Sequence, residues 1–418
     1  MNTNHLIDQY LRPSKESETL LINQISLLRN KNHQEVYKFG FGQSPFPVPQ
    51  KITDALANAA HRKEYMSVQG DLLLRKAIVK FHNDREGKNW HEDNIIVGSG
   101  SKILIFSVMA AFNHVEVLLP APSWVSYEPQ AKLLGHNVDW ITTKFEDKWC
   151  LTAESLDEYC NNRCNPQIPL LLVFNYPNNP TGQTFTSKQL KAFASVMEKH
   201  NVIVIADEIY ALLKYSGKQA SLANYYPQGC IVSSGLSKWC GAGGWRLGFV
   251  HIPPTIGKKL FQSVIGVASE TYSCAPAPIQ VAATTAYQDS NLANDFLNKQ
   301  ISLLSQINQY CQKALNDCGI RVHSCEGGFY LFPDFTGFKT QLNNRNIFTS
   351  NQLTNTLMDE TGVALLPGSA FGMKNSSLTA RLAFVDFDGK QIFDETIHTD
   401  FENIKKGINK LCHWISGL

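Results

Sequence analysis

The chain lacks long hydrophobic runs and an excess of charge of one sign. Its longest apolar stretches, residues 170–174 and 202–206, are far too short to span a bilayer. Lysine and arginine (38 residues) nearly balance aspartate and glutamate (36 residues), and the basic side chains are scattered rather than gathered in blocks. We therefore expect neither a nucleic acid nor a membrane as a partner.

The chain also lacks the cysteine patterns of a metal site or a disulfide framework. None of its ten cysteines forms a Cys-x-x-Cys pair, and no cluster of cysteine and histidine has zinc spacing. Residues 1–18 contain no apolar core of a secretory signal. We expect a cytoplasmic protein with reduced, mostly buried thiols and no bound metal.

The length of 418 residues exceeds the size at which one hydrophobic core stops growing, so we expect two domains. Between about residues 71 and 249, helical patterns alternate with strand patterns. The segments 170–174 and 202–206 are apolar throughout, which is typical of strands covered on both faces in a parallel sheet. The other elements predicted here are helices at 71–81, 102–112 and 190–200, the last with an N-cap at Thr186–Ser187, and strands at 115–119 and 248–252.

The pattern changes after about residue 310. Strands at 326–332 and 379–385 and a terminal helix at 401–415 predict a smaller α+β unit. The fold class that we predict is α/β: a large domain with a mostly parallel sheet flanked by helices, plus a smaller α+β domain. In this division residues 1–50 form an N-terminal arm and part of the small domain, 51–310 form the large domain, and 311–418 form the small C-terminal domain.

Three short segments carry candidate chemistry, and the first two lie at the carboxyl ends of predicted strands. Taken singly, each has an ordinary explanation: an NPTG sequence is a turn, an aspartate after a strand caps a loop, and a lysine is a solvated charge. Their order along the chain, and the eight residues between Lys238 and Arg246, make the combination specific. The segments are 175–182 (NYPNNPTG), 206–210 (ADEIY) and 233–238 (SSGLSK), the last followed by 243–248 (GGWRLG).

Read together, these segments resemble the fold-type I enzymes that use pyridoxal 5′-phosphate (PLP), specifically the class I/II aminotransferases of the aspartate and aromatic type. The resemblance runs from about Gly42 to Arg381. It implies that Lys238 is the catalytic residue that binds PLP covalently. The same amine would then move the substrate proton, which requires a lowered pKa from burial and neighbouring positive charge.

The resemblance assigns the other groups around the PLP ring. Asp207 corresponds to the carboxylate that keeps the pyridine nitrogen protonated. Tyr210 corresponds to the tyrosine that donates to the phenolic oxygen of the cofactor, and Asn179 to the asparagine bonded to the same oxygen. Trp124 corresponds to the aromatic side chain stacked on the ring, with packing in the core as its ordinary alternative. Tyr127 we interpret as structural.

The PLP phosphate needs a helix N-terminus and a cation. The segment 98–102 (GSGSK) lies between an apolar strand and a predicted helix, so its amides can point at an anion. The resemblance implies contacts from Gly100, Ser101 and Lys102, with Arg246 as the fixed guanidinium and Ser237 as a further contact. Gly235 departs from the pattern, because many relatives have a phosphate-binding serine at this position.

The remaining assignments concern the substrate and a second subunit. Arg381 corresponds to the arginine that binds the substrate α-carboxylate with two hydrogen bonds, and Gly42 to a loop glycine next to the same carboxylate. Asn179 and Trp124 also border the substrate by this resemblance. Tyr65 corresponds to the tyrosine that reaches the phosphate of the neighbouring subunit, which implies a homodimer with shared active sites.

The function that the resemblance implies is a PLP-dependent aminotransferase. It would exchange an amino group between an amino acid, with aspartate favoured and aromatic amino acids next, and a 2-oxo acid such as 2-oxoglutarate, in a ping-pong cycle. Two alternatives stay open. One is another PLP reaction on the same scaffold, a C–S β-lyase or an aminocyclopropane-carboxylate synthase. The other is a PLP-binding regulator, disfavoured because only 41 residues precede Gly42.

Overall fold

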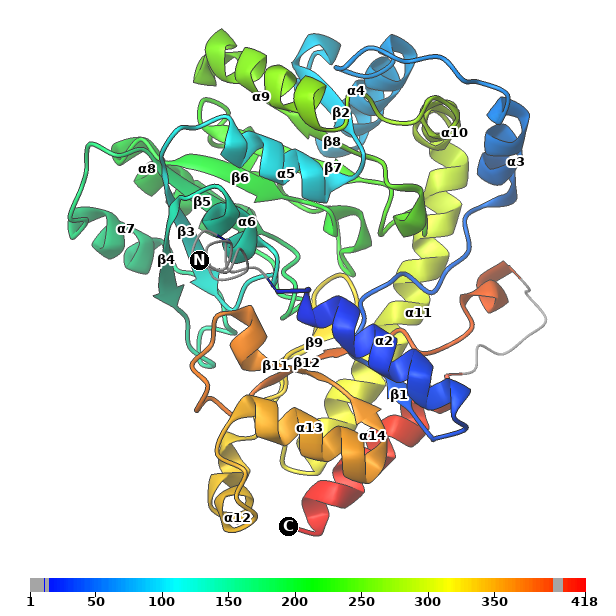
Figure 1. Ribbon diagram of the computed structural model, residues 1–418, viewed down its shortest axis with the longest axis vertical. Helices are drawn as coiled ribbons and strands as arrows, with labels where there is room; N and C mark the ends of the chain where they lie inside the picture. Colours follow the sequence, from blue (N-terminus) through cyan, green and yellow to red (C-terminus); the bar gives the residue numbers. More distant parts are fainter. Residues whose placement is uncertain (1–10, 12–14, 394–400) are drawn as a thin grey trace, which may run out of the picture.

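The structure is a computed structural model that describes residue 11, residues 15–393 and residues 401–418. A seven-stranded sheet with its helices forms the upper part of Figure 1, and a smaller region with short strands forms the lower part. The long helix α11 (Ser290–Asp317) runs from one part to the other. Most of the segment 1–18, in which we expect no secretory signal, lies outside the described residues.

The large sheet has the strand order β2-β8-β7-β6-β5-β3-β4. Its strands are β2 (Ile95–Gly98), β3 (Glu116–Ala121), β4 (Asn137–Thr142), β5 (Leu170–Asn175), β6 (Ile203–Asp207), β7 (Cys230–Gly235) and β8 (Gly248–His251). The strands from β7 to β4 are mutually parallel, whereas β8 is antiparallel to both β7 and β2. The mostly parallel sheet that we expected is therefore confirmed, with β8 as the reversed strand.

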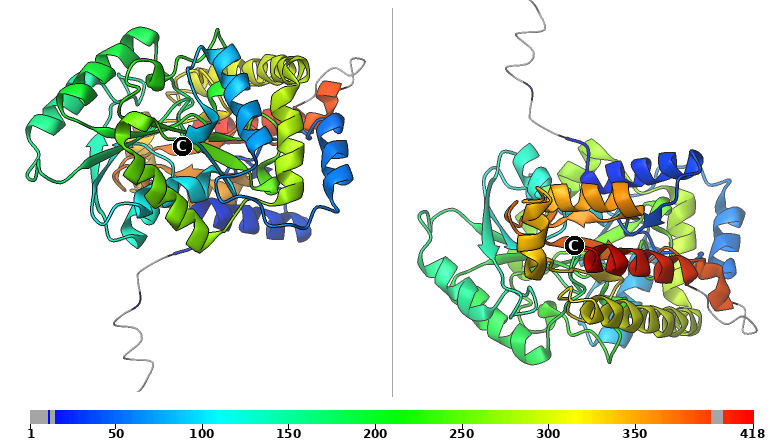
Figure 2. Two further views of the ribbon diagram at one scale, coloured as in Figure 1. Left: turned by 90° about the horizontal axis from the view of Figure 1, so that it is seen from above. Right: turned by 90° about the horizontal axis from the view of Figure 1, so that it is seen from below.

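Both faces of this sheet are buried, which explains the continuous apolar strands. Along β5, Leu170, Leu172 and Phe174 join one hydrophobic cluster, and Leu171 and Val173 join the other. Figure 2 shows helices on both sides of the sheet. One face is covered by α4 (Leu72–Glu86), α8 (Ser187–Lys199) and α10 (Ala277–Gln288), and the other by α5 (Ser101–Ala110), α6 (Tyr127–Leu133) and α9 (Lys258–Thr271).

The predicted helices of this part are present, with their ends shifted by a few residues. Asp71 caps α4 by accepting from two backbone amides, and Thr186 caps α8 in a reciprocal arrangement with Gln189. The other helices of the chain are α2 (Glu18–Lys31), α3 (Gln50–Ala59), α7 (Ala153–Asn161), α12 (Lys339–Asn344), α13 (Ser350–Thr361) and α14 (Glu402–Ser416).

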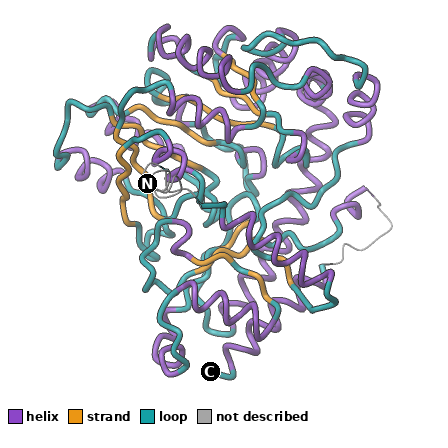
Figure 3. Tube along the Cα trace, in the orientation of Figure 1, coloured by secondary structure: helices purple, strands orange, loops and turns teal. Residues whose placement is uncertain are grey.

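The smaller region is built on an antiparallel sheet in the order β11-β12-β9 and a two-stranded parallel pair. The strands are β1 (Tyr37–Lys38), β9 (Tyr330–Leu331), β10 (Val363–Ala364), β11 (Leu366–Pro367) and β12 (Ala380–Ala383). The predicted strand 326–332 is thus much shorter than expected, because residues 326 and 327 donate instead to the Gly182 carbonyl. Figure 3 shows these short strands below the large sheet, with loops between the two.

The N-terminal segment joins the smaller region through main-chain hydrogen bonds. Strand β1 pairs with β10, and the Ala383 amide donates to the Phe39 carbonyl over 2.8 Å. The boundary that we predict at residue 310 falls inside the continuous helix α11. The assignment of residues to two domains therefore stays a prediction.

Each of the ten cysteines is a free thiol, but only five are buried; Cys164 is exposed and four are half-buried. Among the described residues, no group of three or more His, Cys, Asp or Glu side chains could hold a metal ion. Within the same residues, no helix is long and apolar enough to cross a membrane.

Candidate active site

The predicted site residues gather at one edge of the large sheet. Strands β3, β5, β6 and β7 are parallel, so their carboxyl ends meet at the same edge, and Trp124, Asn179, Asp207 and Lys238 lie at or just after those ends. Strand β2 runs in the same direction, because it and β7 are both antiparallel to β8. This edge is where open α/β sheets bind ligands.

The half-buried side chain of Lys238 lies at this edge. Its Nζ donates to the Gly42 carbonyl over 2.7 Å and lies 5.4 Å from the ring centre of Tyr210 and 5.5 Å from that of Phe329. Burial lowers the pKa of this amine to about 7, and the positive charge of Arg381 acts in the same direction. Much of the Lys238 population is therefore an uncharged nucleophile near neutral pH.

Asp207, at the end of β6, is a buried carboxylate held by neutral donors. Its Oδ2 accepts from the Tyr127 hydroxyl over 2.6 Å, and its Oδ1 accepts from the Ile209 amide over 3.3 Å. Burial raises the pKa of Asp207 to about 6, and the described residues give it no ion pair. Our interpretation of Tyr127 as structural was incomplete, since its hydroxyl is a direct partner of Asp207.

The Asn179 loop is fixed by two asparagines and by the segment before β9. The Asn179 amide donates to Asn175 Oδ1 over 2.7 Å, and Asn175 Nδ2 donates to the Asp207 carbonyl over 2.8 Å. The loop ends at Gly182, whose φ of +69° and close contact with Cys325 leave no room for a side chain. Asn179 and Asp207 are therefore positioned by one connected set of hydrogen bonds.

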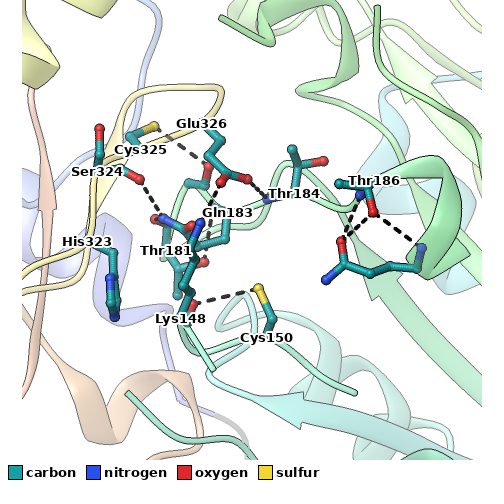
Figure 4. A network of polar contacts seen from close by, with 12 residues as sticks. Lys148, Cys150, Thr181, Gln183, Thr184, Thr186, His323, Ser324, Cys325 and Glu326 are labelled. Carbon is teal, nitrogen blue, oxygen red and sulfur yellow. Dashed lines mark hydrogen bonds and ion pairs between the residues drawn. The ribbon is translucent and has the colours of Figure 1, made fainter. Parts of the chain in front are cut away.

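Figure 4 shows how the next residues of this loop join the segment 323–326. Glu326 accepts from the Thr184 amide over 3.2 Å and from Lys148 Nζ over 3.0 Å. Gln183 Nε2 donates to the Ser324 carbonyl over 2.8 Å. These contacts connect the segment leading into β9 to the large sheet.

The expected phosphate site has a helix N-terminus beside a guanidinium. Helix α5 begins at Ser101, and no side chain caps its first amides. Gly100 has a φ of +97°, and a Cβ there would lie 2.2 Å from Arg246 Nη2, so Arg246 packs directly against the turn. Lys102 follows in the first turn of the helix, and burial lowers its pKa, with Arg246 contributing.

Gly235 and Gly248 lie opposite each other in β7 and β8, and this pairing explains the departure at residue 235. A Cβ on Gly235 would lie 2.7 Å from the Gly248 Cα, and a Cβ on Gly248 would lie 2.4 Å from the Ser101 nitrogen. A serine at 235 would therefore collide with β8. Ser237 lies in the turn before Lys238 and makes no hydrogen bond within the described part of the chain.

Arg381, on β12, is almost fully buried with part of its guanidinium unpaired. Its Nη1 donates to Asn179 Oδ1 over 3.1 Å and its Nη2 to the Gly40 carbonyl over 2.5 Å, while Nε has no partner. Its side chain also lies over the ring of Tyr330, 4.9 Å from the ring centre. Sequence reasoning missed Tyr330, although the pair of glycines before Phe329–Tyr330 marks a close approach of the chain.

Trp124 lies beside the turn at the start of α5, and Tyr65 lies apart. The Trp124 ring is 5.2 Å from that of Tyr127 in an edge-to-face contact, and Lys102 Nζ is 5.3 Å from its centre. Tyr65 is 90% exposed, and among the described residues its side chain makes no hydrogen bond or ring contact with another predicted site residue. One subunit therefore assembles every predicted site residue except Tyr65.

Three groups of this edge match what PLP offers. A buried carboxylate bonded only to neutral donors suits a protonated pyridine nitrogen, an uncapped helix start beside Arg246 suits a phosphate, and an amine with a pKa lowered to about 7 suits an aldehyde. The chemistry of Asp207, Lys238 and the Gly100 turn thus fits the cofactor.

Comparison with known proteins agrees with this chemistry. The chain matches the family described as aminotransferase class I and II over residues 34–386. It is 26% identical to an asparagine–oxo-acid transaminase of Streptococcus mutans (95% of this chain, 96% of the relative) and 28% identical to an aspartate aminotransferase of Geobacillus stearothermophilus (92% and 96%). Among solved structures it is similar in fold to the aspartate aminotransferase of Thermus thermophilus with maleate, with a TM-score of 0.83, 22% identity and coverage of 96% and 97%.

The family match covers most of the chain, and the fold, Lys238 with its lowered pKa and the buried carboxylate of Asp207 are consistent with it. The chain therefore belongs to the class I and II aminotransferases, and it is a PLP-dependent aminotransferase of fold type I.

Proposed function

We propose that this protein exchanges an amino group between an L-amino acid and a 2-oxo acid such as 2-oxoglutarate in a ping-pong cycle. Aspartate is the donor that we favour, followed by aromatic amino acids. The names of the relatives support a small dicarboxylic or amide donor, since one is an aspartate aminotransferase and another an asparagine–oxo-acid transaminase. We also propose that the protein acts in the cytoplasm.

The observation that carries this proposal is the position of the Lys238 amine between a carboxylate site and a cofactor site. PLP, when bound, supplies an electron sink for the substrate Cα–H bond. The amine has a pKa of about 7, so it can attach the cofactor and, once displaced by substrate, accept the Cα proton. The Gly42 carbonyl, which accepts from Lys238, lies 3.4 Å from the Tyr330 hydroxyl, and Arg381 lies over the Tyr330 ring. The Arg381 guanidinium can therefore bind the substrate carboxylate near the amine.

The roles of the other groups follow from their surroundings. Asp207 would hold a proton on the pyridine nitrogen, because that cation is the missing partner of a buried carboxylate. Tyr210 would donate to the phenolic oxygen, together with Asn179. The start of α5 (Gly100, Ser101 and Lys102), Arg246 and Ser237 would bind the phosphate, and Trp124 would stack on the ring.

The donor is identified by a half-reaction panel. Purified holoenzyme is mixed with each of the twenty amino acids in turn, and the loss of the PLP absorption band is followed as the cofactor takes up the amino group. We expect aspartate to convert the band fastest. Release of ammonia and a 2-oxo acid without the aminated cofactor would instead indicate a lyase, and no response to any amino acid would contradict the proposal.

A homodimer with shared sites is a further part of the proposal. Tyr65 is 90% exposed on its own subunit, which supports a role toward the phosphate site of a second subunit. Each site would then combine Lys238 of one chain with Tyr65 of the other.

Mixing Lys238→Ala and Tyr65→Ala proteins tests this arrangement. In a heterodimer one site carries both substitutions and the other carries neither. Random exchange should therefore restore about a quarter of wild-type activity. The Tyr65→Ala homodimer must itself be nearly inactive, and exchange is verified with a tagged subunit. Proven exchange without recovery would mean that Tyr65 acts within its own chain or only in packing.

A further inference from the structure

Tyr330 contacts three groups of the proposed site at once, although no role has been assigned to it. Its hydroxyl lies 2.8 Å from the Tyr210 hydroxyl and 3.4 Å from the Gly42 carbonyl oxygen. Its ring meets that of Tyr210 edge to face, with the centres 5.5 Å apart, and lies under the Arg381 guanidinium. Tyr330 is only 1% exposed, so these contacts form away from solvent.

The backbone at residue 42 leaves space for this hydroxyl. A Cβ on Gly42 would lie 1.9 Å from the Tyr330 oxygen, so any larger residue would displace Tyr330 from Tyr210. The same Gly42 carbonyl accepts from Lys238. The glycine and the two tyrosines therefore form one packed unit beside the reactive amine.

Counting protons fixes the direction of the hydrogen bond between the tyrosines. Each phenol has a single proton to donate. In the proposed function, Tyr210 donates its proton to the phenolic oxygen of PLP, so toward Tyr330 it can only accept. Tyr330 must then donate to Tyr210, over the shorter of its two polar contacts. In a buried chain of this kind, a bond donated to one hydroxyl strengthens the bond that this hydroxyl donates onward.

We infer that Tyr330 is a positioning residue that works through its two neighbours: its hydroxyl directs and strengthens the donation by Tyr210, and its ring holds the Arg381 guanidinium in place. This inference rests on the proposed roles of Tyr210 and Arg381. It assigns separate tasks to two parts of one side chain, and the two parts can be removed one at a time.

The first variant, Tyr330→Phe, removes the hydroxyl and keeps the ring under Arg381. A weaker bond from Tyr210 leaves the phenolic oxygen of PLP more basic. The pH midpoint at which the visible absorption of the substrate-free holoenzyme changes should therefore rise, by roughly 0.3–1 unit. KM for amino acids should change less than about threefold, because the ring remains.

Two comparisons separate this effect from a loss of packing. Tyr215→Phe is the matched control. The Tyr215 side chain is half-buried, and its hydroxyl donates to the carbonyl of Gly328, two residues before Tyr330, over 2.6 Å, yet it has no hydrogen bond to Tyr210. It should leave the midpoint unchanged. In a Tyr210→Phe background, Tyr330→Phe should add no further shift, since the hydroxyl then has no partner through which to act.

The second variant, Tyr330→Leu, also removes the ring. We expect KM to rise about three- to tenfold further than in Tyr330→Phe, equally for all amino acids, because the cation no longer has an aromatic face beneath it. Melting temperatures and cofactor content of all variants confirm that each remains folded and loaded.

The outcomes distinguish this inference from the proposed function. A wild-type protein that converts no amino acid contradicts the proposed function, whatever Tyr330 does. A functional wild-type protein whose midpoint is the same in Tyr330→Phe and Tyr215→Phe, or whose two tyrosine substitutions act additively, overturns the role of the hydroxyl. Equal KM values for Tyr330→Phe and Tyr330→Leu overturn the role of the ring.

Discussion

The proposed cofactor side of the site and the proposed carboxylate side are built in different ways. On the cofactor side, Asp207, Lys238 and the Gly100 turn all lie at the ends of strands of a single sheet. On the carboxylate side, Arg381 donates to the carbonyl of Gly40, which is 341 residues away along the chain. The first side is therefore the edge of one sheet, whereas the second joins segments that are far apart along the chain.

This difference implies that the two sides can be damaged separately. Changes at the sheet edge should affect attachment of the cofactor and the chemical step. Changes at the junction should affect the binding of amino acids and leave the cofactor in place. The following predictions, from the largest expected effect to the smallest, test whether the separation holds.

Lys238→Ala should have the largest effect, on the cofactor side. The variant should fold and can hold PLP without a covalent bond, but borohydride should no longer fix the cofactor to the protein. Activity should fall by roughly 10⁴-fold or more, because the amine that moves the proton is absent. Peptide mapping after reduction of the wild type provides the check, and the label on any other lysine would show the assignment to be wrong. Lys132→Ala, at a surface helix position, is the control.

Asp207→Ala should retain PLP but lose turnover by roughly 10²-fold. The pyridine nitrogen would lose its ionised partner, and an opposite charge at this range is worth about 1–3 pKa units, or 1.4–4 kcal/mol. The measurement is kcat with the best donor, alongside the cofactor content. Activity within a few-fold of wild type would contradict the role of Asp207. The matched control is Asp157→Ala, because the Asp157 carboxylate forms an ion pair with Lys199 and not with a predicted site residue.

Arg381→Lys should weaken the binding of amino acids and leave the binding of the cofactor unchanged. A lysine cannot replace the two-pronged contact, so KM should rise by about 10- to 100-fold for every amino acid. The absorption of the substrate-free holoenzyme should stay close to that of wild type. If KM rises only for dicarboxylic substrates, Arg381 binds the side-chain carboxylate of the substrate instead of the α-carboxylate. If cofactor content also falls, the two sides are not separable.

The last prediction concerns the pH dependence of the rate at which PLP attaches to the apoenzyme. Because burial lowers the pKa of Lys238 to about 7, the neutral amine accumulates as pH rises through 7 instead of near the ordinary lysine range. The rate at which PLP attaches to apoenzyme should therefore rise about tenfold per unit below pH 7 and level off above about pH 8. Rapid mixing followed by absorbance measures this rate. A rate that keeps climbing to pH 10 would mean an ordinary lysine.

Much of the cofactor side could be predicted from local sequence. The apolar strands 170–174 and 202–206 and the segments after them identified the positions of Asn179 and Asp207, and the structure has β5 and β6 there. Lys238 was identified by its motif and its spacing to Arg246, without a predicted strand before it. Local patterns are sufficient here because a strand's burial and the turn that follows it depend on neighbouring residues. The direction of β8 was not predictable, since its apolar pattern fits a parallel or an antiparallel neighbour equally well.

The carboxylate side and the details of each contact were decided by the tertiary structure. Tyr127 was interpreted as structural, and Tyr330 was not singled out, yet one donates to Asp207 and the other meets Tyr210. Nothing near either tyrosine in the sequence specifies its partner, because the partners lie 80 and 120 residues away. The sequence by itself thus determined which residues could do the chemistry and which strands carry Asn179 and Asp207, but not strand β7 before Lys238. Only the folded chain decided the lowered pKa of Lys238 and the partners of Arg381, because burial and long-range contacts exist only once the sheet edge and the N-terminal segment have come together.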